Sequence, residues 1–228
     1  MRMTMLIGLA AMLMMLGGCG TDQGVTRTDA APSAEAAAWT PGVAASADAV
    51  RPAPVGATAP SAVLRTVDGE PFDLTHAYHA SPTILIFYRG GWCPYCNRHL
   101  ADLSRVEGQL RAMGYQLLAV TPDQPAELRK TMTKDHLNYT LLSDSDMTLA
   151  KAFGLAFALD ASTQAKYRGY GINLAAASGG KNTENLLPVP AVYIIDKQGV
   201  IRYVQWNADY TTRLPANEVV TAARQSPH

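Results

Sequence analysis

The sequence is poor in cysteine and has no surplus of charge of either sign. Its 228 residues include 19 basic and 19 acidic side chains, so it lacks the basic excess of a nucleic-acid-binding protein, and we expect no nucleic-acid partner. Three cysteines are too few to hold a small domain together by disulfides. A chain of this length accommodates one domain of medium size and a tail.

The sequence also lacks a hydrophobic run near its N-terminus that is long enough to cross a membrane. The apolar run Met5–Leu16 follows the positive charge of Arg2 and is shorter than the roughly 20 residues of a transmembrane helix. We interpret residues 1–18 as a cleaved signal peptide. The segment Leu16-Gly17-Gly18-Cys19 resembles the bacterial lipobox, which implies that Cys19 becomes a lipidated N-terminal residue. An ordinary secretory signal with an incidental cysteine is the alternative.

Residues 19–54 contain few large apolar side chains and consist mainly of Ala, Pro, Ser, Thr and Asp. A segment of this composition buries too little surface to offset the entropy lost on ordering. We therefore predict a flexible linker between the lipidated Cys19 and the folded domain. The lipid would anchor the protein to a membrane of the cell envelope, facing the periplasm or the outside, without spanning that membrane.

Residues 55–228 show the pattern of a single α/β domain. Thr83–Tyr88 is an uninterrupted apolar run, typical of a strand buried on both faces of a parallel sheet. Pro94–Met113 has apolar residues at helical spacing, and Tyr115–Val120 reads as the next strand, so the three segments predict a βαβ unit. Further helices are expected at 126–137, 146–153 and 216–224, and further strands at 62–65, 139–142, 191–195 and 200–204. These elements predict a mixed sheet flanked by helices, with an irregular segment between Phe153 and Ala191.

Cys93 and Cys96 are separated by two residues and directly follow the predicted buried strand. Cys93 therefore lies at a helix N-terminus, where unpaired backbone N–H groups and the helix dipole stabilise an anion. This position and the Cys-x-x-Cys spacing lower a cysteine pKa from about 8.5 to between roughly 3.5 and 7.5. We expect Cys93 to be a nucleophile and Cys96, one helical turn further, to be the more buried resolving thiol.

Three other uses of the cysteine pair compete with this interpretation. A zinc site needs four ligands, and although His99 extends the pattern, no second pair of ligands follows at matching spacing. Covalent haem attachment requires histidine at position 97, which is asparagine. A structural disulfide between Cys93 and Cys96 would close a loop too short to stabilise the fold much. We expect neither a metal nor another cofactor, while zinc and a structural disulfide stay open alternatives.

The segment Tyr88–Cys96, Tyr-Arg-Gly-Gly-Trp-Cys-Pro-Tyr-Cys, resembles the signature of the peroxiredoxin-like branch of the AhpC/TSA family within the thioredoxin superfamily. The resemblance runs from about Val55 to Ala223 and includes Gly56–Pro60, Leu187–Asp196 and Asp209-Tyr210. It implies a thioredoxin-like fold and reduction of hydroperoxides by the cysteine pair, which a thioredoxin-like donor then re-reduces. Exchange of disulfides in exported proteins is an alternative function for the same pair.

The resemblance also implies roles for three neighbours of the pair. Pro190 matches the superfamily's cis-proline, which packs opposite the active cysteine, although it is also placed as an ordinary proline at the start of a strand. Trp92 would shield the nucleophile or serve as a core aromatic residue. Arg89 would stabilise the thiolate or a leaving oxygen, unless it is a solvated loop arginine.

At two positions the sequence departs from the pattern of typical peroxiredoxins. They have threonine or serine three residues before the nucleophilic cysteine, where this chain has Gly90, and arginine near the strand where this chain has Pro190. Those two side chains normally orient and polarise the peroxide bond. Arg89 and the N–H groups at the helix N-terminus are the candidates to replace them.

Overall fold

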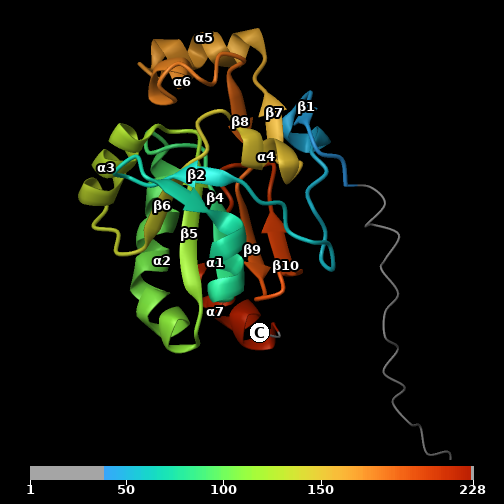
Figure 1. Cartoon of the computed structure of the whole chain (residues 1–228). Coiled ribbons are helices and arrows are strands. Elements are labelled where there is room, and N and C mark those ends of the chain that lie inside the picture. The colour runs from blue at the N-terminus through green and yellow to red at the C-terminus, as the bar shows by residue number, and fades with distance from the viewer. Residues whose placement is uncertain (1–38, 227–228) are drawn as a thin grey trace, which may run out of the picture. The chain divides into compact units, whose positions relative to one another are not determined.

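The computed structural model describes residues 39–226. Within that range the larger sheet has seven strands in the order β10-β9-β4-β5-β6-β2-β3 (Figure 1). Strands β4, β5 and β6 are parallel, β9 is antiparallel to β4, and β9 and β10 form the predicted hairpin. The strands are β2 Val63–Arg65, β3 Pro71–Asp73, β4 Thr83–Phe87, β5 Gln116–Thr121, β6 Thr140–Ser143, β9 Ala191–Ile195 and β10 Ile201–Trp206.

Helices cover both faces of this sheet. Successive residues of a strand point to opposite faces, so Leu85 and Phe87 of β4 share one core with α1 and α4. Ile84 and Ile86 share the other core with α2, α3 and α7. This two-sided burial explains the uninterrupted apolar run in the sequence. The helices are α1 Leu74–Ala80, α2 Pro94–Ala112, α3 Pro125–Lys134, α4 Thr148–Ala152 and α7 Ala216–Gln225.

A smaller sheet has the order β1-β7-β8, and two of its strands, β7 and β8, lie where the sequence predicted an irregular segment. Its third strand, β1, lies in the predicted linker. Between β7 and β8 the chain forms two short helices, which lie together at the top of the view in Figure 1. Strands of two or three residues and helices of one or two turns leave no periodic hydrophobic pattern, so the pattern could not predict them. The elements are β1 Val43–Ala44, β7 Ala156–Ala158, α5 Ala161–Gly169, α6 Leu174–Ala177 and β8 Leu186–Pro188.

The prediction of a flexible linker over residues 19–54 is wrong for residues 39–54. β1 pairs in parallel with β7, a short 3-10 helix follows at Ala47–Ala49, and Val50 and Ala53 are fully buried in the core. The average composition misled the prediction, because a few apolar side chains suffice when they pack on a core that the rest of the domain provides. Residues 1–38, with the predicted signal peptide and Cys19, lie outside the described residues.

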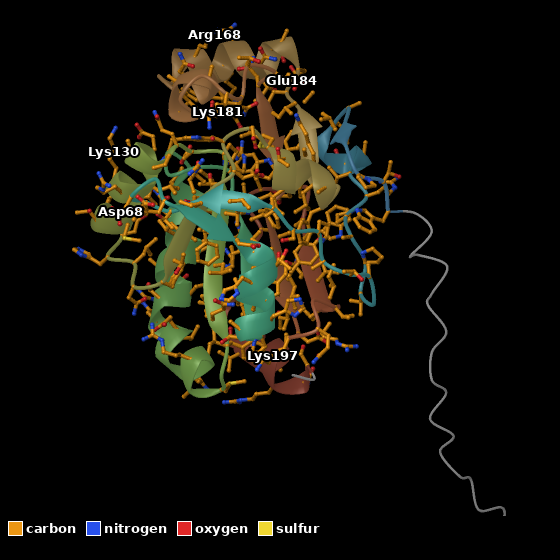
Figure 2. The ribbon with its side chains drawn as sticks, viewed as in Figure 1. Asp68, Lys130, Arg168, Lys181, Glu184 and Lys197 are labelled. Atoms are coloured by element: carbon orange, nitrogen blue, oxygen red, sulfur yellow. The ribbon has the colours of Figure 1, made fainter. Side chains whose placement is uncertain are left out.

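Many of the charged side chains in the described part of the chain lie on its surface. Figure 2 shows Lys130 on α3, Arg168 on α5 and Lys197 in the turn between β9 and β10 pointing away from the ribbon. In the part of the chain that the structure describes, no helix has both the length and the hydropathy needed to cross a membrane.

Candidate active site

Cys93 lies at the N-terminus of α2, directly after the loop that leaves the carboxyl end of β4. It is the N-cap residue, Pro94 occupies the first helical turn, and the backbone N–H of Asn97 donates to the Cys93 carbonyl at 3.1 Å. Proline is favoured there because its missing N–H has no helical partner in any case. The prediction of Cys93 at a helix N-terminus is confirmed.

The two thiols of the pair differ strongly in acidity. Both are free cysteines; Cys93 is 1% exposed and Cys96 is fully buried. A hydrogen bond from the Cys96 thiol, against the opposing effect of burial, lowers the pKa of Cys93 to about 6, and the Cys96 backbone N–H and the charges of Arg89 and Arg213 act in the same direction. Burial, together with the hydrogen bond given to Cys93, raises the pKa of Cys96 well above its ordinary value. At neutral pH the site therefore holds one thiolate and one thiol.

Arg89 lies in an aromatic cage rather than in solvent. Its side chain is 4% exposed, and the guanidinium carbon lies 3.8 Å from the ring centre of Tyr210, 5.2 Å from that of Trp92 and 5.6 Å from that of Tyr167. The guanidinium also donates a hydrogen bond to the Tyr167 hydroxyl. Burial lowers the pKa of Arg89, but an arginine stays charged at any physiological pH. The alternative of a solvated loop arginine is wrong.

Trp92 packs beside the pair and shapes the loop that carries Cys93. Its ring meets the ring of Tyr167 edge to face, with the ring centres 5.5 Å apart. Gly90 has φ +152°, and a Cβ on it would overlap the indole of Trp92. This close approach requires glycine at position 90. The Trp92 indole therefore occupies the space next to position 90 in which a threonine or serine side chain would lie.

The peptide bond before Pro190 is trans, because residues 39–226 contain no cis peptide bond. The match of Pro190 to a cis-proline is therefore wrong. The chain runs extended from β8 into β9 without a tight turn, and the Pro190 carbonyl accepts the Asn207 N–H at 3.3 Å, so the favoured trans isomer fits. Pro190 lines one cavity together with Arg89.

Two ionisable residues reach the site from segments that carry no motif in the sequence. Arg213, in the loop between β10 and α7, donates from Nη2 to Cys96 Sγ at 3.5 Å. Asp123 follows β5, is 3% exposed, and accepts the Gly91 N–H at 2.7 Å. Burial raises the pKa of Asp123 to about 7. Both residues lie in loops. Hydrophobic periodicity could not identify them, because the position of a loop side chain depends on the tertiary structure and not on a local pattern.

His99 is buried on α2 near the pair. Burial, and next the charge of Arg213, lower the pKa of His99 to about 4, so the ring is neutral at neutral pH. Among residues 39–226, no three His, Cys, Asp or Glu side chains lie together in a way that could hold a metal ion.

A cavity of about 270 Å³ opens beside Arg89. Tyr210 and Tyr167 also line it, so the cavity borders the aromatic cage. Its other walls come from the N-terminal segment, from β7 and the start of α5, and from the segment between β8 and β9. The remaining lining residues are mostly apolar: Ala45, Ser46, Ala47, Phe157, Ala158, Leu159, Asp160, Thr163, Val189, Pro190 and Ala208.

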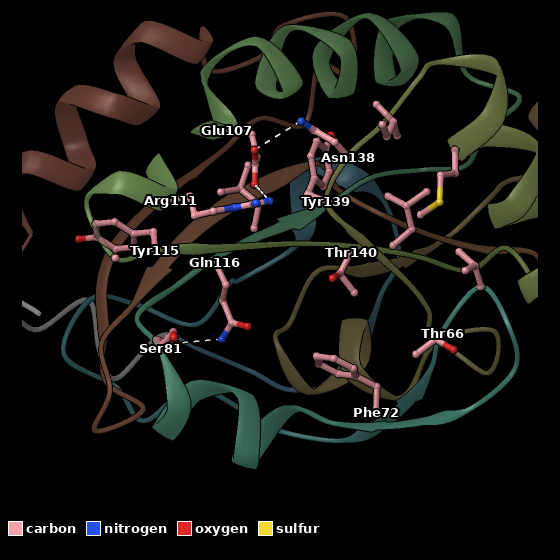
Figure 3. Close-up of a pocket in the computed structure, with 16 residues that line it drawn as sticks. Thr66, Phe72, Ser81, Glu107, Arg111, Tyr115, Gln116, Asn138, Tyr139 and Thr140 are labelled. Carbon is pink, nitrogen blue, oxygen red and sulfur yellow. Dashed lines mark hydrogen bonds and ion pairs between the residues drawn. The ribbon is translucent and has the colours of Figure 1, made fainter. Parts of the chain in front are cut away.

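A larger cavity of about 710 Å³ lies at the other end of the parallel strands. Its walls include Gln116 and Thr140, which begin β5 and β6, whereas Cys93 follows the carboxyl end of β4. Figure 3 shows Glu107 between Arg111 and Asn138 on one side of it. This cavity is therefore separate from the cysteine pair.

Comparison with known proteins agrees with the sequence resemblance. The AhpC/TSA family matches residues 55–204 of the chain. A putative peroxiredoxin bcp from Haemophilus influenzae is 30% identical over 106 residues, which cover 46% of this chain and 68% of that protein. Peroxiredoxin Bcp from Escherichia coli is also 30% identical over 106 residues, covering 46% of this chain and 67% of that protein.

Solved structures show the same architecture. Reduced Prx3 from Vibrio vulnificus, in complex with hydrogen peroxide, superposes with a TM-score of 0.60 at 20% identity, covering 75% of this chain and 98% of that one. Peroxidoxin BcpB from Mycobacterium tuberculosis gives a TM-score of 0.59 at 18% identity, and the match covers 76% of this chain and 98% of that one. The predicted thioredoxin-like fold is confirmed.

Proposed function

The chain belongs to the AhpC/TSA family, and on that premise we propose that it reduces hydroperoxides, with Cys93 as the nucleophile and Cys96 as the resolving thiol. The Cys93 thiolate attacks one oxygen of the O–O bond, an S–O bond forms, and the second oxygen leaves with a proton as water or an alcohol. Cys96 then displaces water from the sulfenic acid to form a disulfide. A thioredoxin-like donor reduces the disulfide and completes the cycle.

The observation that carries this proposal is the difference in acidity between the two thiols. A peroxide is attacked by a thiolate and not by a thiol, and only Cys93 is ionised at neutral pH. Cys96 stays protonated and close enough to hydrogen-bond the nucleophile, so it is available for the second step. The charge of Arg89 and the N–H groups at the start of α2 favour negative charge on sulfur and on the leaving oxygen.

Rapid mixing of the reduced chain with hydrogen peroxide, and separately with a model mixed disulfide, tests this function. We expect a fast change in Trp92 fluorescence with peroxide that is lost in Cys93→Ser and kept in Cys96→Ser. A reaction with the disulfide alone would contradict the peroxidase function and support thiol–disulfide exchange on exported proteins.

The cavity beside Arg89 suggests where an organic hydroperoxide would bind. Its mostly apolar walls suit the carbon portion of such a substrate, and Arg89 connects the cavity to the thiolate. We propose that the carbon portion occupies this cavity while the O–O group lies toward Cys93.

We also propose that Cys19 carries a lipid that anchors the protein to a membrane of the cell envelope. This proposal is supported by the sequence Leu16-Gly17-Gly18-Cys19 after a short apolar run. Labelling of expressing cells with a radioactive fatty acid is expected to mark the protein, and Cys19→Ser is expected to abolish the label and release the protein from the membrane fraction. An unlabelled protein would refute the anchor and leave the redox chemistry untouched.

A further inference from the structure

Two arginines approach the cysteine pair from different loops, and both lower the pKa of Cys93. Arg89 lies in the loop after β4. Its charge lowers the pKa of Cys93, whereas the burial of Cys93 raises that pKa. Arg213 arrives from the loop before α7, 117 residues after Cys96, and its Nη2 lies 3.5 Å from Cys96 Sγ. A hydrogen bond from a guanidinium to sulfur is worth most when the sulfur is negative.

The loop holds Arg213 in place through its own backbone. Nη1 donates to the carbonyl of Thr212 at 2.9 Å and to the carbonyl of Tyr210. These contacts occupy one nitrogen of the guanidinium and leave Nη2 directed at Cys96. Among the residues that the structure describes, Arg213 forms no direct ion pair with a carboxylate. Asp209, in the same loop, is the nearby carboxylate that interacts with its charge.

The charged and titratable groups around Cys96 explain why an arginine is needed there. Neither Cys93 nor Tyr88 can supply a positive charge, and His99 on the same helix is neutral at neutral pH. Arg89 also interacts with Cys96 through its charge, but its guanidinium is held in the aromatic cage. Burial and the neighbouring Cys93 thiolate both raise the pKa of Cys96, while Arg213 lowers it. Arg213 is therefore the cation in direct contact with a thiol that must lose its proton before it can attack.

We propose that Arg213 is a catalytic residue for the resolving step, in which it stabilises the Cys96 thiolate as that thiolate attacks the sulfenic acid on Cys93. Cys96 loses its proton, an S–S bond forms, the S–O bond of Cys93 breaks, and the departing hydroxide takes up a proton to become water. The Cys93 sulfur is reduced and the Cys96 sulfur is oxidised, so no further oxidant or reductant is needed. This inference rests on the proposed function for its substrate, the sulfenic acid.

Arg213→Met and Arg213→Lys in the full-length chain test the proposal. Both are made in a Cys19→Ser background, so that the pair holds the only cysteines. The pKa of Cys93 is about 6, and Arg213 makes the smallest of the contributions that lower it. At pH 8 we therefore expect Cys93 to stay mostly ionised in both variants and peroxide attack to keep its rate within about threefold. In Arg213→Met, conversion of the sulfenic acid to the disulfide is expected to slow at least about tenfold, because a rise of one unit in the pKa of Cys96 lowers its thiolate fraction about tenfold. Arg213→Lys is expected to slow this step less. Trapping with a dimedone reagent at successive times measures both steps.

Arg105→Met is the matched control, because Arg105 is an exposed arginine on α2 that forms an ion pair with Asp102 on the same helix. It is expected to leave both steps unchanged. Equal slowing of attack and resolution in Arg213→Met would show that the arginine merely shapes the loop around Tyr210, and unchanged resolution would show that it does nothing to Cys96. Either result overturns the proposal.

A second measurement separates this inference from the peroxidase function. Cys93 is converted to a mixed disulfide with thionitrobenzoate, and release of the coloured thiol reports the attack of Cys96 on Cys93 without any peroxide. Arg213→Met is expected to slow that release about tenfold as well. Slow release in a protein that does not react with peroxide would uphold the role of Arg213 and reject the peroxidase, whereas release at the unmodified rate would reject the role of Arg213.

Discussion

At the scale of single residues, the acidity of Cys93 depends mainly on its partner. The hydrogen bond from the Cys96 thiol is the largest influence that lowers the pKa of Cys93 to about 6. Cys96→Ala removes this donor, so the pKa of Cys93 is expected to rise by about one unit or more. Cys96→Ser keeps a donor and is expected to produce a smaller rise. The pH dependence of iodoacetamide labelling measures both values, and an unchanged pKa in Cys96→Ala would show that the helix N-terminus and the arginines are sufficient.

The sequence identified the reactive residues better than it identified their surroundings. Arg89, Cys93 and Cys96 lie close together in the sequence. The Cys-x-x-Cys spacing after a buried strand by itself indicates a reactive thiol pair. Arg213 and Tyr167 come from distant segments, so their contacts with Cys96 and Arg89 depend on how loops fold over the sheet. No local pattern encodes such contacts.

At the scale of elements, α3 fixes the position of the loop that carries Cys93. A Cβ on Gly91 would overlap the Thr131 hydroxyl, while the Gly91 N–H and carbonyl are held by Asp123 and Asn97. Gly91→Ala is expected to lower the free energy of unfolding by roughly 1–3 kcal/mol through overpacking. Thr131→Ala is expected to recover much of that loss in the double variant, so the two changes are coupled. Additive losses, measured by urea unfolding, would show that the overlap is relieved elsewhere.

Residues 39–54 are a second segment that differs from the sequence prediction, since they pack on the domain and do not form a linker. Val50 is fully buried, whereas Val55 is 54% exposed. Val50→Ala is expected to lower the free energy of unfolding by about 2 kcal/mol, and Val55→Ala to change it by less than about 0.5 kcal/mol. Equal small effects in urea unfolding would mean that residues 39–54 behave as the linker that their composition suggested.

The long elements were predictable, whereas only some of the short ones were. The run Thr83–Tyr88 and the helical spacing over Pro94–Met113 predicted β4 and α2 within one or two residues, because each buries a continuous face. The sequence does not predict α1, β1 or β3, and it predicts an irregular segment where β7, β8, α5 and α6 lie. Elements this short derive their stability from neighbours that the local sequence does not contain.

At the scale of the whole molecule, segments distant in sequence combine to form the cavity beside Arg89. Ala45 belongs to its lining and lies outside residues 55–204, which match the family. Ala45→Trp would narrow the cavity, and Ala45 is exposed, so the fold should tolerate the change. We expect kcat/KM for cumene hydroperoxide to fall about tenfold and that for hydrogen peroxide to stay unchanged. Ala49→Trp, on the same segment but away from this cavity, is the control, and equal effects of the two variants would exclude the cavity as a substrate site.

The central claim is that Cys93 is the ionised thiol that peroxide oxidises and that Cys96 resolves the product. Mass spectrometry of the reduced chain after one equivalent of hydrogen peroxide tests it most directly. The account predicts a single disulfide between Cys93 and Cys96, and in Cys96→Ser one added oxygen on Cys93 and on no other residue. Oxidation of other residues with Cys93 left reduced would contradict the account.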